Sequence, residues 1–125
     1  MEELHCESVY SLDLPFPLGI IDENRVYLSG RTARDPDTGE PLVGIAAETE
    51  QILSDIEMML ESAGSSIDNA IQVTVYLENM SEIGTFNEIY KSYLSEPYPA
   101  RSAVEVSDLA ADFSVEVELV ARLEP

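Results

Sequence analysis

The sequence predicts an α+β domain in which one mixed β-sheet carries two helices on the same face. Residues 71–77 and 113–121 alternate between apolar and polar side chains, as half-buried strands do. Two other segments, residues 45–63 and 79–94, repeat their apolar residues at helical spacing. In order along the chain the elements read β-β-α-β-α-β-β. The 125 residues are enough for one core, so we expect a single domain over residues 1–125.

The first two strands are expected over residues 9–14 and 25–30. Between them lies "PFPLGI", which its prolines must stiffen or turn, and a "DEN" turn. After the second strand, "RDPDTGEP" combines aspartate, proline and glycine in the manner of a tight hairpin-like loop.

The first helix is expected over residues 45–63, the longest periodic segment of the chain. Thr49 is the one polar member of its apolar stripe, and Gly64 follows as the expected end of the helix. The apolar members are Ile45, Ile52, Leu53, Ile56, Met59, Leu60 and Ala63. A third strand, "IQVTVYL", then alternates strictly.

The second helix is expected to begin with Asn79 or Ser81 as its cap. Its apolar side consists of Phe86, Ile89, Tyr90 and Tyr93. The stretch "SEPYP" stops it, and the strands "RSAVEVS" and "FSVEVELVA" complete the sheet.

The charge of the chain excludes several classes of partner. Six basic residues stand against 25 acidic ones, for a formal net charge of −19, and the basic residues form no cluster. Nucleic acid and anionic membranes need clustered Lys and Arg, so neither is expected to bind. The acidity either serves solubility alone or adapts the protein to a very salty cytoplasm, where screening relieves self-repulsion. We favour the second, halophilic interpretation.

The N-terminus and the cysteine content predict a soluble cytoplasmic protein. No apolar run approaches the roughly 20 residues that span a bilayer, and "MEELHCESVY" has no features of a signal peptide. Cys6 is the single cysteine and has no partner for a disulfide. His5 and Cys6 have no second cluster to complete a metal site, and a Ser-His-Asp triad lacks a well-placed histidine.

The face of the sheet away from the helices is predicted to be mixed in character. Glu116 and Glu118 alternate with the core valines of the last strand, and Gln72, Thr74 and Tyr76 do so in the middle strand. If Val104 and Val106 join the core, the far face also receives Arg101, Ala103 and Glu105. Such a face suits a homo-oligomer with its sheets turned inward, although an antiparallel sheet can also leave one face wet.

Arg101 and Glu116 are expected to meet across neighbouring strands on this far face. They would form either a cross-strand ion pair or a site for a small anion. A guanidinium fork binds a carboxylate through two parallel hydrogen bonds. A partly desolvated glutamate has a raised pKa and can move protons through a water molecule. The pair would suit chemistry on a small carboxylic acid.

Several motifs together resemble one family. "YPARSAVEV" and "VEVELVAR" are similar to motifs of the reactive intermediate deaminase family, also called Rid or YjgF and often labelled endoribonuclease L-PSP. "VYLSGRTARDPDTGE" and "FNEIYKSYL" extend the resemblance over roughly residues 26–122. It implies a chorismate-mutase-like fold and a homotrimer with active sites in the clefts between subunits. It also implies hydrolysis of enamine and imine intermediates, such as 2-aminoacrylate, to 2-oxo acids and ammonia, without metal or organic cofactor.

The resemblance also assigns roles to individual residues. Arg101 stands at the position of the arginine that binds the substrate carboxylate, and Glu116 at the position that handles water and protons. Ser29 and Gly30 match the residues that line the cleft at the end of a strand, and Asn87 matches an asparagine near the site.

Three positions depart from the family pattern, and one of them is Leu14, which replaces a glycine before the proline. Ala103 stands where many members have cysteine, which hydrolysis through water does not need. Phe16, in "SLDLPFPLGIIDEN", takes roughly the place of a tyrosine that enters the site, so one hydroxyl is lost.

Other functions remain open beside the deaminase. The same cleft could hold a small carboxylate without turnover, as a sensor or regulator, or the acidic surface could act as a chaperone. The net charge of −19 argues against RNA as a substrate.

Overall fold

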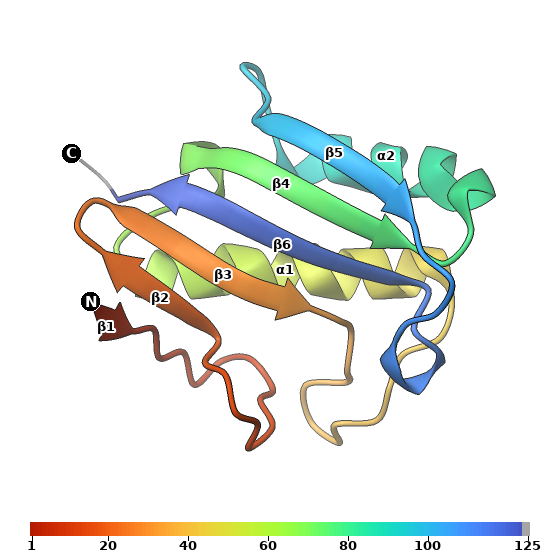
Figure 1. Ribbon diagram of the computed structural model, residues 1–125, viewed down its shortest axis with the longest axis horizontal. Helices are drawn as coiled ribbons and strands as arrows, with labels where there is room; N and C mark the ends of the chain where they lie inside the picture. Colours follow the sequence, from red (N-terminus) through yellow and green to blue (C-terminus); the bar gives the residue numbers. More distant parts are fainter. Residues whose placement is uncertain (124–125) are drawn as a thin grey trace.

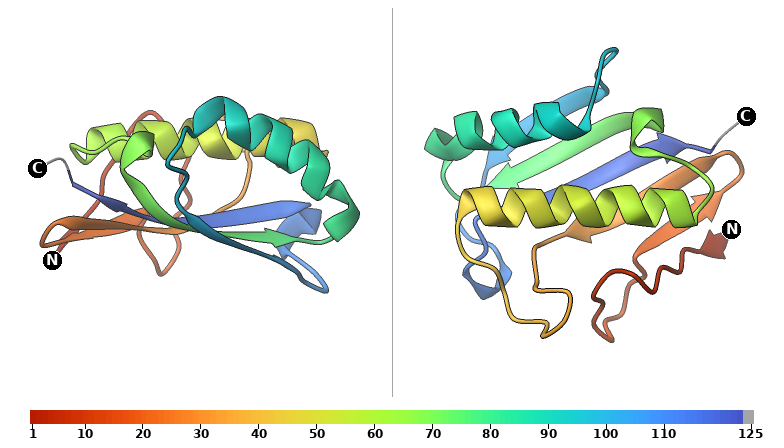
Figure 2. Two further views of the ribbon diagram at one scale, coloured as in Figure 1. Left: turned by 90° about the horizontal axis from the view of Figure 1, so that it is seen from above. Right: turned by 180° about the vertical axis from the view of Figure 1, so that it is seen from behind.

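The structure is a computed structural model that describes residues 1–123, and it consists of one β-sheet with two helices packed on one face (Figures 1 and 2). The strands are β1 (Glu2–Glu3), β2 (Gly19–Asp22), β3 (Arg25–Arg31), β4 (Ala70–Leu77), β5 (Ala100–Glu105) and β6 (Val115–Arg122). The helices are α1 (Ile45–Ser62) and α2 (Ile83–Tyr93), with short 3₁₀ turns at Ile67–Asn69, Met80–Glu82 and Ala110–Asp112. The predicted α+β class is confirmed. Within residues 1–123, no helix is long and apolar enough to cross a membrane.

The six strands lie in the order β1-β2-β3-β6-β4-β5. The β4–β5 pair is parallel and the other pairs are antiparallel, so the sheet is mixed as predicted. The parallel pair follows from the connection between the two strands, because α2 carries the chain back along the helix face before β5 begins. This arrangement leaves β5 as an edge strand (Figure 1).

The predicted first strand over residues 9–14 is wrong. That segment has no strand partner, and its apolar residues Leu12 and Leu14 are 44% and 46% exposed. The edge of β3 that it would need is already paired with β2, which begins only after Pro15 and Pro17. Residues 5–17 instead form an irregular segment, with a turn at residues 7–8 and bends at residues 9 and 15–16, beside the end of the sheet; we call it the N-terminal strap.

Helix α1 packs its apolar stripe against the sheet. Its most deeply buried apolar residues are Ile52, Leu53, Ile56, Met59 and Leu60. The buried Glu48 accepts hydrogen bonds from the backbone N–H of Gly44 at 2.9 Å and of Ser114 at 2.8 Å. It therefore satisfies a free donor at the start of the helix and fixes the turn before β6. Gly64 follows the helix with φ 84°, a left-handed conformation that glycine adopts without a steric penalty.

The strand register defines which side chains share a face. In the centre of the sheet, Val73 and Val75 are buried under the helices and pair with Leu119 and Val117 of β6. The intervening residues point away from the helices. Four of them are Thr74, Tyr76, Glu116 and Glu118, as the alternating pattern predicts.

The face predicted for strand β5 is wrong. Val73 pairs with Arg101 and Val75 with Ala103, so Arg101, Ala103 and, by alternation, Glu105 lie on the helix face. Val104, which was expected in the core, is 42% exposed and lies on the far face. The reason is that β5 is an edge strand whose helix side is covered by aromatic rings of α2. An arginine can therefore occupy that side, while a valine is left at the surface.

Candidate active site

Arg101 lies against aromatic rings and not against acidic residues. Its guanidinium carbon is 4.9 Å from the ring centroid of Tyr90 and 5.7 Å from that of Phe86, both on α2. These are cation–π distances, and they orient the side chain without using its hydrogen-bond donors. Among residues 1–123, no carboxylate forms an ion pair with Arg101. The fork of donors is therefore available for an external anion.

A pocket of about 300 Å³ opens beside this arginine. It is lined by Asn87, Tyr90, Lys91, Tyr98, Pro99 and Arg101. The Tyr98 ring stacks on Tyr90 with centroids 6.5 Å apart, which gives the pocket an aromatic wall. Within the described chain, the Asn87 Oδ1 and the Tyr90 hydroxyl are buried and have no hydrogen-bond partner. Burial raises the pKa of Tyr90, against the opposing effect of Arg101, so its hydroxyl stays protonated at neutral pH.

Glu116 belongs to a separate cluster on the opposite face of the sheet. Burial raises the pKa of its carboxyl above the usual value, and the nearby negative charge of Glu118 raises it further. A Cβ atom at Gly30 would lie 2.2 Å from Glu116 Oε2. The Glu116 carboxylate therefore occupies space that is free because Gly30 has no side chain. Such a half-buried glutamate is suited to exchange protons with a bound water.

Glu118 is itself held by a tyrosine. The Tyr76 hydroxyl donates a short hydrogen bond to the Glu118 carboxylate, and this bond is the main cause of the raised pKa of Tyr76. Tyr76 lies directly opposite Glu116 in the pairing of β4 with β6. The hydrogen bond therefore fixes a negative charge two residues from Glu116 on the same face of β6.

Ser29 and Gly30 lie where β3 changes register against β6, between Leu28 and Arg31. The Ser29 hydroxyl donates to the Pro17 carbonyl at 2.8 Å, and its N–H donates to the Leu18 carbonyl at 3.0 Å. These two hydrogen bonds hold the end of the N-terminal strap against β3, so Ser29 has a structural role within a single chain.

Phe16 lies on the same strap, close to the segment that Ser29 fastens. It is 54% exposed and therefore does not belong to the core. Together with Gly30 and other residues of the strap it lines a pocket of about 560 Å³. The position predicted to enter the site from the resemblance is thus available to a ligand or to another subunit.

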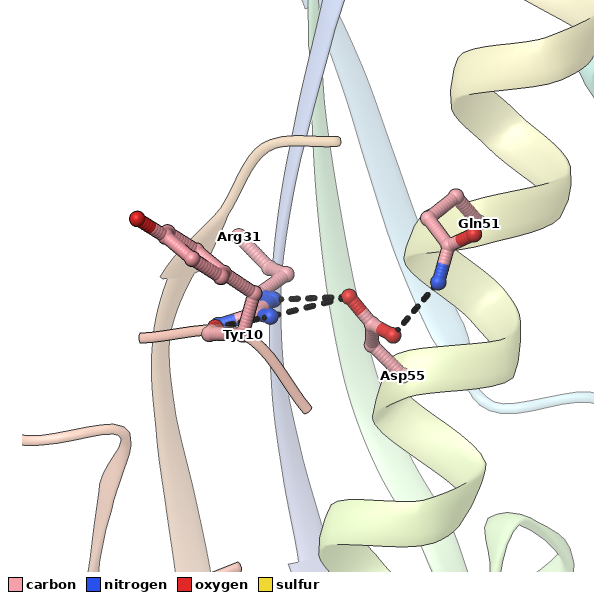
Figure 3. Close-up of polar contacts among 4 residues, drawn as sticks. All are labelled: Tyr10, Arg31, Gln51 and Asp55. Atoms are coloured by element: carbon pink, nitrogen blue, oxygen red, sulfur yellow. Dashed lines mark hydrogen bonds and ion pairs between the residues drawn. The ribbon is translucent and has the colours of Figure 1, made fainter. Parts of the chain in front are cut away.

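A second arginine holds the middle of the strap (Figure 3). Arg31 donates from Nε and Nη2 to Asp55 Oδ2 of α1 at 3.1 and 2.9 Å, and from Nη2 to the Tyr10 carbonyl at 2.6 Å. Gln51 donates to the other oxygen of Asp55 at 2.8 Å. The side chains of Arg31 and Asp55 are 12% and 2% exposed. This buried network ties the strap to α1 immediately beside Gly30.

The predicted site residues thus fall into two groups, and one chain does not bring them together. The Arg101 half-site contains Arg101 and Asn87, with Ala103 on the same face of β5 and packed against the core. The Glu116 half-site contains the residues placed on the other side, which are Glu116, Gly30, Ser29 and Phe16. The predicted contact between Arg101 and Glu116 is wrong, because β4 separates β5 from β6 and the two side chains leave opposite faces.

Sequence reasoning missed the residues that support these half-sites. Tyr90 was expected only as a core residue of α2, and Tyr98 was read as part of a turn. The buried Asp55 did have a signal in the sequence, since it lies between Ile52 and Met59 at helical spacing on the apolar stripe. A carboxylate at such a position needs a buried cation, and Arg31 is that cation.

Within residues 1–123, no group of three or more His, Cys, Asp or Glu side chains is arranged to hold a metal ion. The groups that the half-sites present are a guanidinium that can bind an anion, a carboxyl that can exchange protons, and buried polar groups.

Comparisons with known proteins identify the family and match the fold. The family model described as Endoribonuclease L-PSP matches residues 14–123. A RutC family protein of Pyrococcus horikoshii is 39% identical over 124 residues, which cover 94% of this chain and 98% of that protein. A protein of Mus musculus named 2-iminobutanoate/2-iminopropanoate deaminase is 34% identical over 108 residues, covering 86% of this chain and 80% of that protein. The crystal structure of RidA from an Antarctic Psychrobacter superimposes with a TM-score of 0.94 at 31% identity, over 98% of this chain and 100% of that chain.

Proposed function

Since this chain belongs to the endoribonuclease L-PSP family, also called the Rid or YjgF family, we propose that it is a deaminase of reactive enamines and imines. Its substrates are of the 2-aminoacrylate type, and its products are 2-oxo acids and ammonia. The observation that carries the proposal is Arg101, which has no acidic partner among residues 1–123 although the chain has a net charge of −19. The acidic surface of this protein repels anions in general. A guanidinium without an acidic partner, placed in a pocket, is therefore expected to bind a specific anionic ligand there. The deaminase name of the mouse relative points to the same reaction.

The two half-sites require a second copy of the chain to complete one active site. We propose a homotrimer in which the Arg101 half-site of one subunit faces the Glu116 half-site of the next. The far face of the sheet supports this assembly, because Tyr27 and Val104 on it are 46% and 42% exposed. Large apolar side chains on one face, interleaved with polar ones, are typical of a subunit interface. The assembly is expected in the cytoplasm.

The proposed reaction uses each half-site for a separate task. Arg101 binds the substrate carboxylate, and the enamine tautomerises to the imine, whose carbon is electrophilic. Glu116 accepts a proton from a water molecule as the oxygen of that water bonds to the imine carbon. That proton passes to the nitrogen and gives a carbinolamine. The carbinolamine hydroxyl then gives up its own proton, which also reaches the nitrogen through the Glu116 carboxyl, so the carbon–nitrogen bond breaks, ammonia leaves and the 2-oxo acid forms. Positioning together with general acid–base catalysis supplies roughly 10²–10⁴-fold acceleration, which is sufficient for substrates that also hydrolyse unaided.

The experiment that tests this proposal compares wild type with Arg101→Ala. Both are supplied in high salt with the imine that an amino acid oxidase forms from alanine, and the remaining imine is trapped with semicarbazide. Loss of the carboxylate anchor is expected to lower kcat/KM by about 10²–10³-fold. Arg25→Ala is the matched control, since among residues 1–123 Arg25 forms no ion pair and its side chain donates one hydrogen bond, of 3.4 Å, to the carbonyl of its neighbour Asn24. Equal activity of wild type and Arg101→Ala would refute the proposal.

A second candidate function is a trimer that binds small carboxylates without turnover. Phe16 favours it, because a phenylalanine offers no hydroxyl to orient a substrate. In that case wild type would clear no imine, yet a small 2-oxo acid would raise its melting temperature and would not raise that of Arg101→Ala.

A further inference from the structure

The pocket beside Arg101 carries more positive charge than a three-carbon imine needs. Two of the six basic residues of the chain, Arg101 and its single lysine, Lys91, line it together. None of the described residues that line it is acidic, although acidic residues outnumber basic ones by 25 to 6 in the sequence. The larger pocket under the N-terminal strap is different, because Glu3, Glu7 and Asp13 are among its lining residues. The Arg101 pocket is thus a local cationic site on a strongly anionic protein.

Helix α2 presents three side chains to this pocket. Tyr90 follows Asn87 by three positions and Lys91 follows it by four, so both lie near Asn87 on one side of the helix. The Tyr90 ring lies under the guanidinium of Arg101, which places the α-carboxylate of a bound substrate near the middle of that face. Lys91 follows Tyr90 along the helix and has a long, flexible side chain with a terminal charge.

Lys91 has only a weak partner within the described chain. Its ammonium nitrogen lies 3.6 Å from Glu88 Oε1, and the two side chains are 61% and 77% exposed. Ion pairs as exposed as this one contribute little and exchange readily for another anion. Asn87 and Tyr90 line the same pocket, and in the described chain their side-chain oxygens are buried without a hydrogen-bond partner, which is costly for a polar group. The weakly paired Lys91, beside Arg101, points to a ligand with a second anionic group.

We propose that this site accepts dicarboxylic 2-imino acids of four or five carbons, with Lys91 binding the distal carboxylate while Arg101 binds the α-carboxylate. The proposal rests on the deaminase function proposed above and adds a substrate class to it. Lys91 is then a specificity-determining residue: it discriminates between substrates and takes no part in breaking the carbon–nitrogen bond.

The test compares imines that differ in size and in charge. An amino acid oxidase generates them from alanine, from norvaline and from glutamate, so that the last two have chains of five carbons and differ in the distal carboxylate. Lys91→Gln is expected to lower the glutamate-to-norvaline ratio of kcat/KM values about ten-fold or more, the scale of losing one charge-assisted hydrogen bond. Glu88→Gln is the matched control, because it removes the ion-pair partner of Lys91 and keeps the lysine. It is expected to leave that ratio unchanged or to raise it.

Salt concentration provides a second readout. The glutamate-to-norvaline ratio of wild type is expected to fall as salt rises, because screening weakens the attraction of Lys91 for the distal carboxylate. The measurements begin at the lowest salt at which the protein keeps its fold.

The outcomes separate this proposal from the deaminase function. If wild type clears the alanine-derived imine but Lys91→Gln leaves the glutamate-to-norvaline ratio unchanged, the substrate class is wrong and the deaminase function stands. If wild type clears none of the imines, the deaminase function fails. The recognition of a dicarboxylate is then measured by melting temperature with 2-oxoglutarate and 2-oxovalerate. A larger rise with 2-oxoglutarate that disappears in Lys91→Gln supports the role of Lys91, and equal rises overturn it.

Discussion

Two arginines of this chain have opposite environments. Arg31 is almost buried, and its donors are used by the Asp55 carboxylate and the Tyr10 carbonyl. Arg101 is held by the faces of two aromatic rings, and no acidic residue of the described chain pairs with it. Arg31 therefore completes the fold of one chain, whereas Arg101 is left with binding capacity for something outside it. The partners of a guanidinium distinguish a structural arginine from a ligand-binding one better than its burial does.

The largest effect is expected at the buried arginine. Arg31→Met should lower the free energy of unfolding by about 3–5 kcal/mol, because it leaves the carboxylate of Asp55 buried without its cation. Chemical denaturation of this variant and of wild type measures the difference.

Two further variants identify the cause. Arg25→Met, on the same strand β3, should change the free energy of unfolding by less than about 0.5 kcal/mol, as surface substitutions usually do. Replacing both members of the pair, with Arg31→Met and Asp55→Leu, should recover much of the lost stability. If Arg31→Met were as stable as wild type, the structural role assigned to Arg31 would be wrong.

The next effect concerns the space that Gly30 leaves for Glu116. In Gly30→Ala the new methyl group would lie 2.2 Å from Glu116 Oε2, so the carboxylate must move from its position. We expect kcat/KM for the alanine-derived imine to fall about 10²-fold, the upper range for loss of general acid–base catalysis being roughly 10⁴-fold.

Gly84→Ala is the matched control for this substitution. Among residues 1–123, apart from the adjoining residues and backbone of its own helix α2, no atom lies within 4 Å of a Cβ atom at Gly84. This variant should keep its activity and gain about 0.5–1 kcal/mol of stability, because alanine favours a helix more than glycine does. Full activity of Gly30→Ala would contradict the place given to Glu116.

A smaller effect is expected in the pH dependence of the reaction. Burial and the charge of Glu118 raise the pKa of Glu116, and the base must be deprotonated to activate water. The acid limb of kcat/KM should therefore lie above the ordinary pKa of a glutamate. Glu118→Gln removes one of the two causes and should move that limb to lower pH. A limb that does not move in Glu118→Gln would mean that another group controls it.

The same shift has a consequence for stability, with a defined sign. The folded protein holds the proton of Glu116 more tightly than the unfolded chain does, because the folded pKa is the higher one. The ionised carboxylate therefore disfavours folding above the folded pKa, and this penalty is absent below the unfolded pKa. Glu116→Gln should remove this pH-dependent penalty. Denaturation of the variant and of wild type at a pH below the unfolded pKa of Glu116 and at a pH above its folded pKa would detect the difference.

At Arg101 the effect on stability is expected to be small, in contrast to the effect at Arg31. Methionine can pack on the rings of Tyr90 and Phe86 as the guanidinium does. The free energy of unfolding of Arg101→Met should therefore lie within about 1 kcal/mol of the wild-type value. Its activity should nevertheless be lost as in Arg101→Ala. A large loss of stability in Arg101→Met would remove the contrast between the two arginines.

Much of the fold could be predicted because its central elements have unambiguous periodicity. The stripe of α1 and the alternation of β4 and β6 each determine a buried face without reference to the rest of the chain. The error in β5 arose because an edge strand need not bury its apolar residues. The residues of β5 are mostly exposed on both faces, so alternation alone did not distinguish the side of Arg101 from the side of Val104.

The components of the candidate site could be predicted, and their arrangement could not. The motifs identified Arg101 and Glu116, but their relative position depends on β5 pairing with β4 and not with β6. This pairing follows from the path of α2 across the sheet, which no local pattern records. The support given to the strap by Arg31 and Asp55 is likewise a contact between residues 24 positions apart in the chain.

The central claim is that one active site takes Arg101 from one subunit and Glu116 from another, and mixing two inactive variants tests it most directly. Arg101→Ala and Glu116→Gln are unfolded together in equal amounts, refolded, and assayed for clearance of the alanine-derived imine. In a randomly assembled ring of three, a site works when a chain with intact Arg101 adjoins one with intact Glu116 on the correct side. One half times one half gives activity of about one quarter of wild type. Recovery near this level is the predicted result, and a mixture as inactive as its two components would contradict the account.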